Sequence, residues 1–216
     1  MIKGLAPHTQ EIFERISRLE CLTPFVLVGG TALSLQIETR KSEDLDFMRW
    51  RTSKDDKLDI GWPNIEKELR EVGDIENVEV LGFDQVIFIV SKVKISFYAA
   101  PRKRIPTMIE IPFLNNIRLA DINSIGVMKM EAMMRRNTFR DYYDIYSILK
   151  NGTDVFQLIK DATAHSQHKL KTKNLLSILT NGDYFKRDED FLQLEPIYNV
   201  TSGDIQEYIK GKLKKT

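Results

Sequence analysis

Apolar residues along the first half of the chain recur with the spacings of both helices and strands. Residues 8–20 carry four apolar side chains at helical spacing, which predicts an amphipathic helix. The uninterrupted apolar run at 25–28 is typical of a buried strand, and Gly29 and Gly30 end it. Thr31 is then expected to cap the helix that follows.

Strict alternation of polar and apolar positions marks the next strand, in which Asp44 and Asp46 alternate with Leu45 and Phe47. A hairpin is expected further along, with residues 91–92 at its turn. The other elements predicted in this half are a polar loop at 51–60, a helix at 62–73, and strands near 77–82, 85–90 and 93–99.

Beyond Leu119 the pattern becomes helical to the end of the chain. We therefore expect an α+β fold in which a mixed sheet with flanking helices, at 1–118, precedes an all-α lobe at 119–216. The helices predicted in the second lobe are 121–136, 139–150, 153–166, 172–180 and 202–213.

Composition narrows the class of protein. The 216 residues are 42% hydrophobic and 29% charged, which excludes a disordered or collagen-like chain. No apolar run approaches the length of a membrane span, and no signal-peptide stretch begins the chain, so a cytoplasmic protein is expected. A single cysteine excludes a disulfide framework and a thiolate zinc site. The formal net charge of +1 gives no bulk sign of nucleic-acid binding.

Two carboxylates carry the most informative chemistry. Alternate side chains of a strand point to the same side, so Asp44 and Asp46 project together, with Cα atoms about 6.5–7 Å apart. Carboxylates at this spacing can grip a divalent cation, and hard oxygen ligands favour Mg²⁺ or Mn²⁺. Because Mg²⁺ usually completes its shell with water and substrate phosphate, the pair points to a nucleotide.

The glycine pair supplies a site for that phosphate. Gly29 and Gly30 let the backbone approach a ligand, and the helix N-terminus directs N–H groups at an anion, to which Thr31 adds a hydroxyl. Each piece alone has a structural explanation, since Asp-x-Asp is common and Gly-Gly-Thr can be a tight turn before a capped helix. The combination of strand, Gly-Gly-Thr, helix and strand with paired aspartates is a far more specific sign of a nucleotide site than either piece alone.

The segment from Val28 to Phe47 resembles the opening motif of the polymerase-β-like nucleotidyltransferase superfamily, and within it the AbiEii/AbiGii toxin family. Lys94-Ile-Ser-Phe97 resembles that family's central hairpin strand. Residues 125–129 and 140–146 resemble its two helical motifs. The order and spacing hold over roughly residues 10–150.

The resemblance implies a nucleotidyltransferase fold and transfer of a nucleotide from an NTP to an RNA or protein acceptor. Family members are often toxins of toxin–antitoxin pairs, and some act on tRNA ends, so a tRNA acceptor and an antitoxin protein are candidate partners; no membrane partner is expected. The residues assigned by resemblance are Asp44 and Asp46 for the metal, Gly29, Gly30, Thr31, Arg40 and Ser42 for the nucleotide, Lys129 for phosphate, and Asp141 to complete the catalytic set.

From the residues alone, Lys129 could be an exposed helix residue and Asp141 a helix cap. Two positions depart from the superfamily pattern: Ser96 stands where many members carry a third carboxylate, and Ser124 where an aspartate is expected before Lys129. Asp121, three residues before Ser124, is a possible substitute for the missing aspartate.

These departures keep open an alternative, a catalytically weakened nucleotide- or partner-binding module on the same fold. Antibiotic modification is a third, weaker hypothesis. The basic loop at 102–104 could hold RNA phosphates, although a solvated loop explains it as well.

Overall fold

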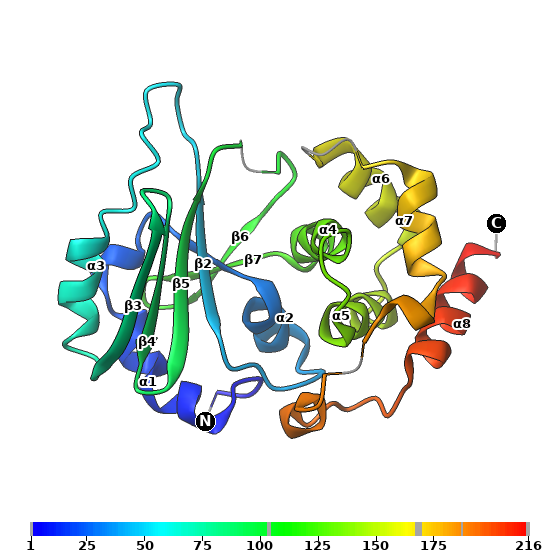
Figure 1. Ribbon diagram of the computed structural model, residues 1–216, viewed down its shortest axis with the longest axis horizontal. Coiled ribbons are helices and arrows are strands. Elements are labelled where there is room, and N and C mark those ends of the chain that lie inside the picture. Colours follow the sequence, from blue (N-terminus) through cyan, green and yellow to red (C-terminus); the bar gives the residue numbers. More distant parts are fainter. Residues whose placement is uncertain (1, 103–104, 167–169, 187, 215–216) are drawn as a thin grey trace. The chain divides into compact units, whose positions relative to one another are not determined.

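The computed structural model of the protein describes residues 2–102, 105–166, 170–186 and 188–214. Two residues of the basic loop, Lys103 and Arg104, therefore lie outside the described residues. The chain divides into two compact units, Met1–Asp121 and Ile122–Thr216 (Figure 1).

The first unit is built on one seven-stranded mixed sheet, with the strand order β3-β4-β5-β2-β1-β7-β6. The strands are β1 (Val26–Val28), β2 (Leu45–Trp50), β3 (Ile75–Gly82), β4 (Gln85–Val90), β5 (Val93–Ala100), β6 (Glu110–Leu114) and β7 (Ile117–Ala120).

The centre of the sheet joins segments that are distant in the sequence. β1 pairs antiparallel with β2 and parallel with β7, and β2 pairs parallel with β5. β4 and β5 form the expected hairpin, in which Ser91 and Lys92 both have positive φ. Positive φ at both central residues is the conformation of the tight turns that match the twist of a hairpin.

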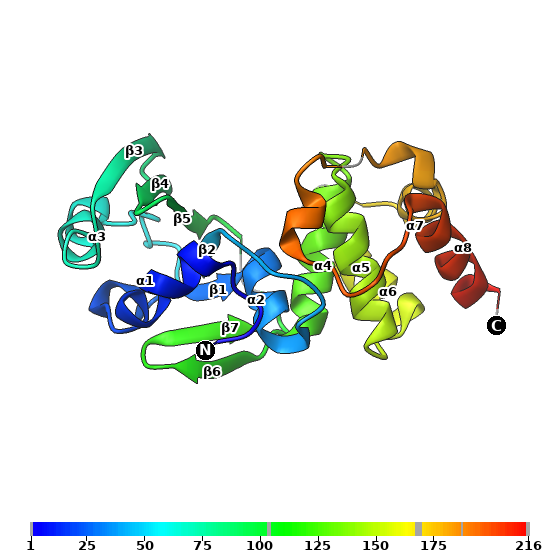
Figure 2. The same cartoon turned by 90° about the horizontal axis from the view of Figure 1, so that it is seen from below.

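Helices cover the two faces of this sheet: α1 (Pro7–Ser17) and α3 (Trp62–Leu69) lie on one side, and α2 (Gly29–Ile37) lies on the other (Figure 2). A short 3₁₀ turn, η1 (Glu20–Leu22), follows α1. The α1–α3 side buries the apolar residues of β2 and β5, where the rings of Phe47 and Phe97 stack with centroids 5.3 Å apart. The alternation read from the sequence therefore produces one buried face and one half-exposed face.

Apart from the ends of some elements, the structure differs from the sequence-based expectation in two main respects. Strands β6 and β7 are not predicted from the pattern; β6 is an edge strand that contains Pro112, and proline is tolerated only where no ladder N–H is needed. Helix α2 begins at Gly29 with Val28 as its N-cap, so the expectation that Thr31 caps the helix is wrong.

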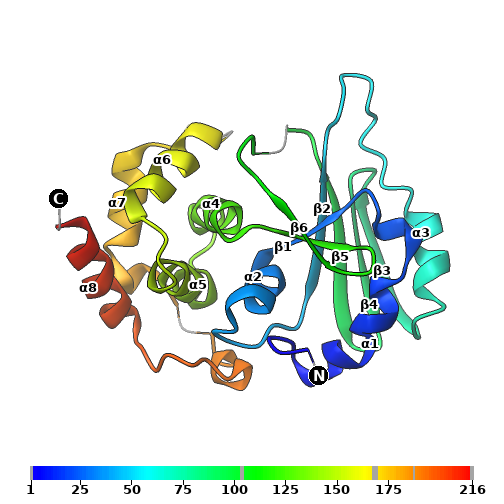
Figure 3. The same cartoon turned by 180° about the vertical axis from the view of Figure 1, so that it is seen from behind.

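The second unit consists of helices and short helical turns (Figure 3). The main contacts join α4 with α5 and α6, and α8 with α5 and α6. The elements of this unit are α4 (Ile122–Met133), α5 (Phe139–Lys150), α6 (Val155–His165), α7 (Thr172–Leu179), η2 (Gly182–Tyr184), η3 (Phe191–Leu194) and α8 (Ser202–Leu213). These bounds and those of the sheet confirm the α+β class expected from the sequence.

No helix among the described residues is long and apolar enough to cross a membrane.

Close packing of α4 depends on a glycine. A Cβ on Gly126 would lie 2.8 Å from Cδ1 and 3.2 Å from Cδ2 of Leu158 on α6. Replacing Gly126 by leucine should therefore lower the free energy of unfolding by about 1–3 kcal/mol through overpacking. The matched control is Gly211→Leu on α8, where a Cβ would meet nothing within 4 Å; its greater helix propensity predicts no loss. Urea unfolding compares the two, and equal stability of both variants would contradict this packing.

Candidate active site

The paired aspartates lie at the start of the central strand β2. Asp46 is the second residue of the strand, and Asp44 immediately precedes the first strand residue, Leu45. Leu45 and Phe47 are buried on the opposite face, with exposed fractions of 0% and 2%. The strand therefore turns both carboxylates toward the half-exposed face, as the sequence pattern predicts.

Strand β5 places a second pair of polar residues alongside. Asp46 is in register with Ser96, whose hydroxyl donates a hydrogen bond of 2.5 Å to Oδ1 of Asp46. Lys94 precedes Ser96 on the same face, and its Nζ lies 3.7 Å from Oδ2 of Asp44. The position at which many superfamily members carry a third carboxylate is thus adjacent to Asp46 and holds a neutral hydrogen-bond donor.

This set of donors fits a magnesium or manganese ion. Two half-exposed carboxylates supply hard oxygen ligands, and Mg²⁺ takes only one or two carboxylates when substrate phosphates and water complete its shell. No cluster of three or more acidic, histidine or cysteine side chains is present in the described part of the chain. A cation held by Asp44 and Asp46 would therefore depend on the substrate for further ligands.

The start of helix α2 packs directly against the second aspartate. Gly29 has a φ of +72°, and a Cβ on it would lie 2.9 Å from Oδ2 of Asp46. Glycine is required here both by the left-handed conformation and by the close approach. Because Val28 provides no side-chain cap, backbone N–H groups at this helix end are available for an anion.

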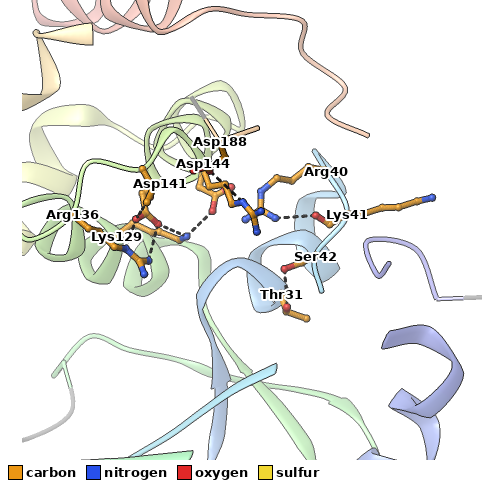
Figure 4. Close-up of polar contacts among 11 residues, drawn as sticks. Thr31, Arg40, Lys41, Ser42, Lys129, Arg136, Asp141, Asp144 and Asp188 are labelled. Carbon is orange, nitrogen blue, oxygen red and sulfur yellow. Dashed lines mark hydrogen bonds and ion pairs between the residues drawn. The ribbon is translucent and has the colours of Figure 1, made fainter. Parts of the chain in front are cut away.

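A guanidinium group lies at the same helix end. A Cβ on Gly30 would lie 2.5 Å from Nη2 of Arg40, so a larger residue here would displace the guanidinium from this position. Arg40 is buried, and its Nη1 donates to the carbonyl oxygen of Lys41 at 2.9 Å (Figure 4). Gly30 and Arg40, which the sequence assigned separately to nucleotide binding, are therefore in contact.

Two hydroxyl groups hold the aspartate segment in place. Thr31 is 1% exposed, and its hydroxyl is hydrogen-bonded to the Ser42 hydroxyl at 2.8 Å and to the carbonyl oxygen of Asp44 (Figure 4). The backbone of Ser42 in turn pairs with Gly4 and Ala6 near the start of the chain. Both hydroxyls point inward, and their contacts position Asp44; a direct contact of either with phosphate stays a prediction.

In the helical unit, Lys129 of α4 and Asp141 of α5 form a buried ion pair. Lys129 Nζ lies 2.7 Å from Oδ1 of Asp141 and 2.7 Å from Oδ2 of Asp144 (Figure 4). Nε of Arg136 and the hydroxyl of Thr138 lie 2.6 Å and 2.8 Å from Oδ2 of Asp141. Lys129 is thus buried, and the alternative that it is an exposed helix residue is wrong.

Asp144 is the member of this cluster that the sequence analysis missed. It lies three residues after Asp141 on α5, a spacing that puts both carboxylates on one helix face. Together, the two aspartates balance the charges of Lys129 and Arg136.

The protonation of Asp141 follows from these contacts. Burial alone would raise the pKa of Asp141, but the charges and hydrogen bonds of Lys129 and Arg136 outweigh it and hold the pKa below the usual aspartate value. A carboxylate that stays ionised and carries four polar contacts is a weak proton acceptor. These contacts give Lys129 and Asp141 a structural role; direct contact with substrate stays a prediction for both.

The structure also shows where Ser124 lies, the residue that stands in place of the aspartate expected before Lys129. Ser124 lies on α4 and is buried, with 1% of its surface exposed. Asp121 precedes the helix, and its carboxylate accepts the backbone N–H of Ile109 at 2.8 Å. Asp121 therefore contacts the backbone of the first unit, and its use in place of an aspartate before Lys129 stays a prediction.

A comparison with models of protein families identifies the family of the chain. The family model of the nucleotidyl transferase AbiEii toxin, of type IV toxin–antitoxin systems, matches residues 11–211. The chain belongs to the AbiEii family. The match extends well past residue 150, where the recognisable motifs end, and it includes all the candidate site residues named from the sequence.

Individual relatives of this AbiEii-family chain span nearly its whole length. The uncharacterized protein aq_aa25 of Aquifex aeolicus is 27% identical over 222 residues, which cover 99% of this chain and 98% of the relative. Among solved structures, JHP933 from Helicobacter pylori is 18% identical with a TM-score of 0.49 and covers 98% of this chain and 95% of its own. A proposed nucleotidyltransferase from the same organism is 19% identical with a TM-score of 0.49, covering 96% and 95%.

The contact between α2 and Asp46 can be measured with a pair of glycine variants. Gly29→Ala combines a left-handed conformation with a clash against Asp46, whereas Gly61→Ala has a similar φ of +64° and nothing within 4 Å. We expect Gly61→Ala to cost about 1–2 kcal/mol in unfolding free energy and Gly29→Ala to cost more. Urea unfolding of both variants gives the comparison; equal losses would show that Asp46 does not press on the helix start.

The buried ion pair should be essential for the helical unit. Lys129→Met leaves two buried carboxylates with one cation fewer, and breaking such a pair costs about 3–5 kcal/mol. Lys160→Met, at an exposed position on α6, is the control and should change little. Thermal unfolding of both variants tests this, and a fully stable Lys129→Met protein would contradict the assigned role.

Proposed function

We propose that the protein is a metal-dependent nucleotidyltransferase that transfers a nucleotide from an NTP to an RNA or protein acceptor, as a toxin of a toxin–antitoxin pair. Membership of the AbiEii family supports the nucleotidyl transferase and toxin character and an antitoxin partner. The observation that carries the proposal is the contact of Asp46 with both Ser96 and the start of α2.

In this proposal, different parts of the first unit hold the metal ion and the phosphates of the NTP. Asp44 and Asp46 would hold Mg²⁺ or Mn²⁺, which supplies charge neutralisation and orientation to the phosphates when bound. The N–H groups at the start of α2 and the guanidinium of Arg40 would bind phosphate oxygens, and Lys94 adds a positive charge beside Asp44.

Positioning and electrostatic stabilisation would supply most of the rate enhancement, as in phosphoryl transfer generally. Ser96 cannot serve as an anionic ligand or a general base, but its hydrogen bond orients the Asp46 carboxylate. Thr31 holds the backbone of Asp44 in place. Ser96 and Thr31 therefore act mainly by fixing the positions of the Asp46 and Asp44 carboxylates.

A second candidate function is a nucleotide- or partner-binding module without transfer. It is favoured by Ser96 in place of a third carboxylate and by Asp141, whose charge is already neutralised by Lys129 and Arg136. This alternative predicts binding of NTP with no labelled product for any acceptor.

The test is incubation with each α-³²P-labelled NTP, Mg²⁺ or Mn²⁺, and total RNA. Asp44→Asn and Asp46→Asn should each abolish transfer without unfolding the protein, because an amide cannot supply the anionic ligand. Asp74→Asn, at an exposed aspartate elsewhere in the same unit, is the matched control and should retain full activity.

The outcomes separate the two candidate functions. Metal-dependent label in RNA or protein with the wild type alone would support transfer and reveal the base and the acceptor. A folded Asp46→Asn variant with wild-type activity would overturn the assignment of the aspartates. Binding of NTP without label in any acceptor would favour the module without transfer.

A further inference from the structure

The half-exposed face of the sheet continues beyond the aspartates into a second row of residues. In the first row, Asp46 of β2 is in register with Ser96 of β5. Two residues further along, Tyr98 of β5 is in register with Met48 of β2 on one side and with Gln85 of β4 on the other. Because strands advance about 6.5–7 Å in two residues, the second row lies one such step from Asp46 on the same face.

The three members of this row are half-buried and alternate with fully buried neighbours. Val86, Phe97 and Phe47, on the opposite face, have exposed fractions of 0–2%. Tyr98, Gln85 and Met48 are intermediate in exposure. The row therefore presents a ring, an amide and a thioether at a surface that continues the candidate active site.

The polar side-chain groups of this row form no hydrogen bond with any other described residue. In the part of the chain that the structure describes, neither the Tyr98 hydroxyl nor the side-chain amide of Gln85 has a hydrogen-bond partner. Two tyrosines of the helical unit differ: Tyr142 donates to the carbonyl of Leu179 at 2.7 Å, and Tyr208 to that of Leu149. Those two hydroxyls stabilise the fold, whereas the Tyr98 hydroxyl and the Gln85 amide belong to half-buried residues and keep their hydrogen-bonding capacity for a ligand.

We infer that Tyr98 and Gln85 form a nucleobase site, with Met48 beside the ring. This inference rests on the proposed function, because the phosphate and metal row next to it determines what class of ligand reaches the second row. An aromatic ring stacks on a base of any kind, and a glutamine amide can donate and accept one hydrogen bond each at a base edge. The ligand is the base of the NTP or the 3′-terminal base of an RNA acceptor, which share this chemistry.

The inference is tested by equilibrium binding of each NTP with Mg²⁺ and of short RNAs that differ only in the 3′-terminal base. The variants are Tyr98→Leu, Tyr98→Phe and Gln85→Leu, with Tyr184→Leu in the helical unit as the control. We expect Tyr98→Leu to weaken binding about tenfold, while Tyr98→Phe keeps most of the affinity because the ring remains. Gln85→Leu should reduce the preference among bases about tenfold.

The two ligand series identify the source of the base. A changed ranking among NTPs assigns the site to the donor nucleotide, and a changed ranking among RNAs assigns it to the acceptor. Wild-type affinities and rankings in folded Tyr98→Leu and Gln85→Leu would overturn the inference, as would a wild-type protein that binds neither ligand.

Failure of the proposed function gives a different result. If Tyr98→Leu weakens nucleotide binding and Gln85→Leu reduces the base preference as expected, and yet no acceptor is ever labelled, the transfer reaction is wrong and the base site stands. If the wild type transfers nucleotide and binding in both variants is unchanged, only the base site is wrong.

Discussion

The parallel pairing of β2 with β5 is the constraint on which the candidate site depends. It sets Asp46 beside Ser96 and Asp44 near Lys94, although about fifty residues separate the two strands in the sequence. A shift of one residue in this register would turn every side chain of one strand to the other face. The buried stack of Phe47 on Phe97 opposes such a shift, because the ring on the shifted strand would leave the core and the stack would be lost.

A second set of contacts acts on the same strand from the other side. The first turn of α2 lies against Asp46, and Thr31 binds the carbonyl of Asp44 through its buried hydroxyl. Two glycines make this possible: Gly29 by its left-handed backbone and Gly30 by leaving space for Arg40. The glycine pair thus allows the close approach of Asp46 and Arg40 at a helix N-terminus that has no side-chain cap.

The sequence predicted much of this arrangement because the patterns concerned are local. Alternation around Asp44 and Asp46 identified both the strand and the face of the carboxylates, and the turn at residues 91–92 identified the hairpin. Strand β6 was missed because Pro112 interrupts the strand pattern and its edge position became apparent only from the sheet. The inward direction of the Thr31 hydroxyl was missed for a related reason, since its partner is the carbonyl of a residue thirteen positions away.

Long-range contacts also explain what the sequence left open in the helical unit. Whether Lys129 is exposed depends on the approach of α5 to α4, and in the structure two aspartates enclose it. The most direct test of the central claim is an anomalous difference map from crystals grown with Mn²⁺ and a non-hydrolysable NTP. We predict a manganese peak bound by the carboxylates of Asp44 and Asp46, with phosphates at the start of α2. A bound nucleotide whose manganese contacts neither aspartate would contradict the account.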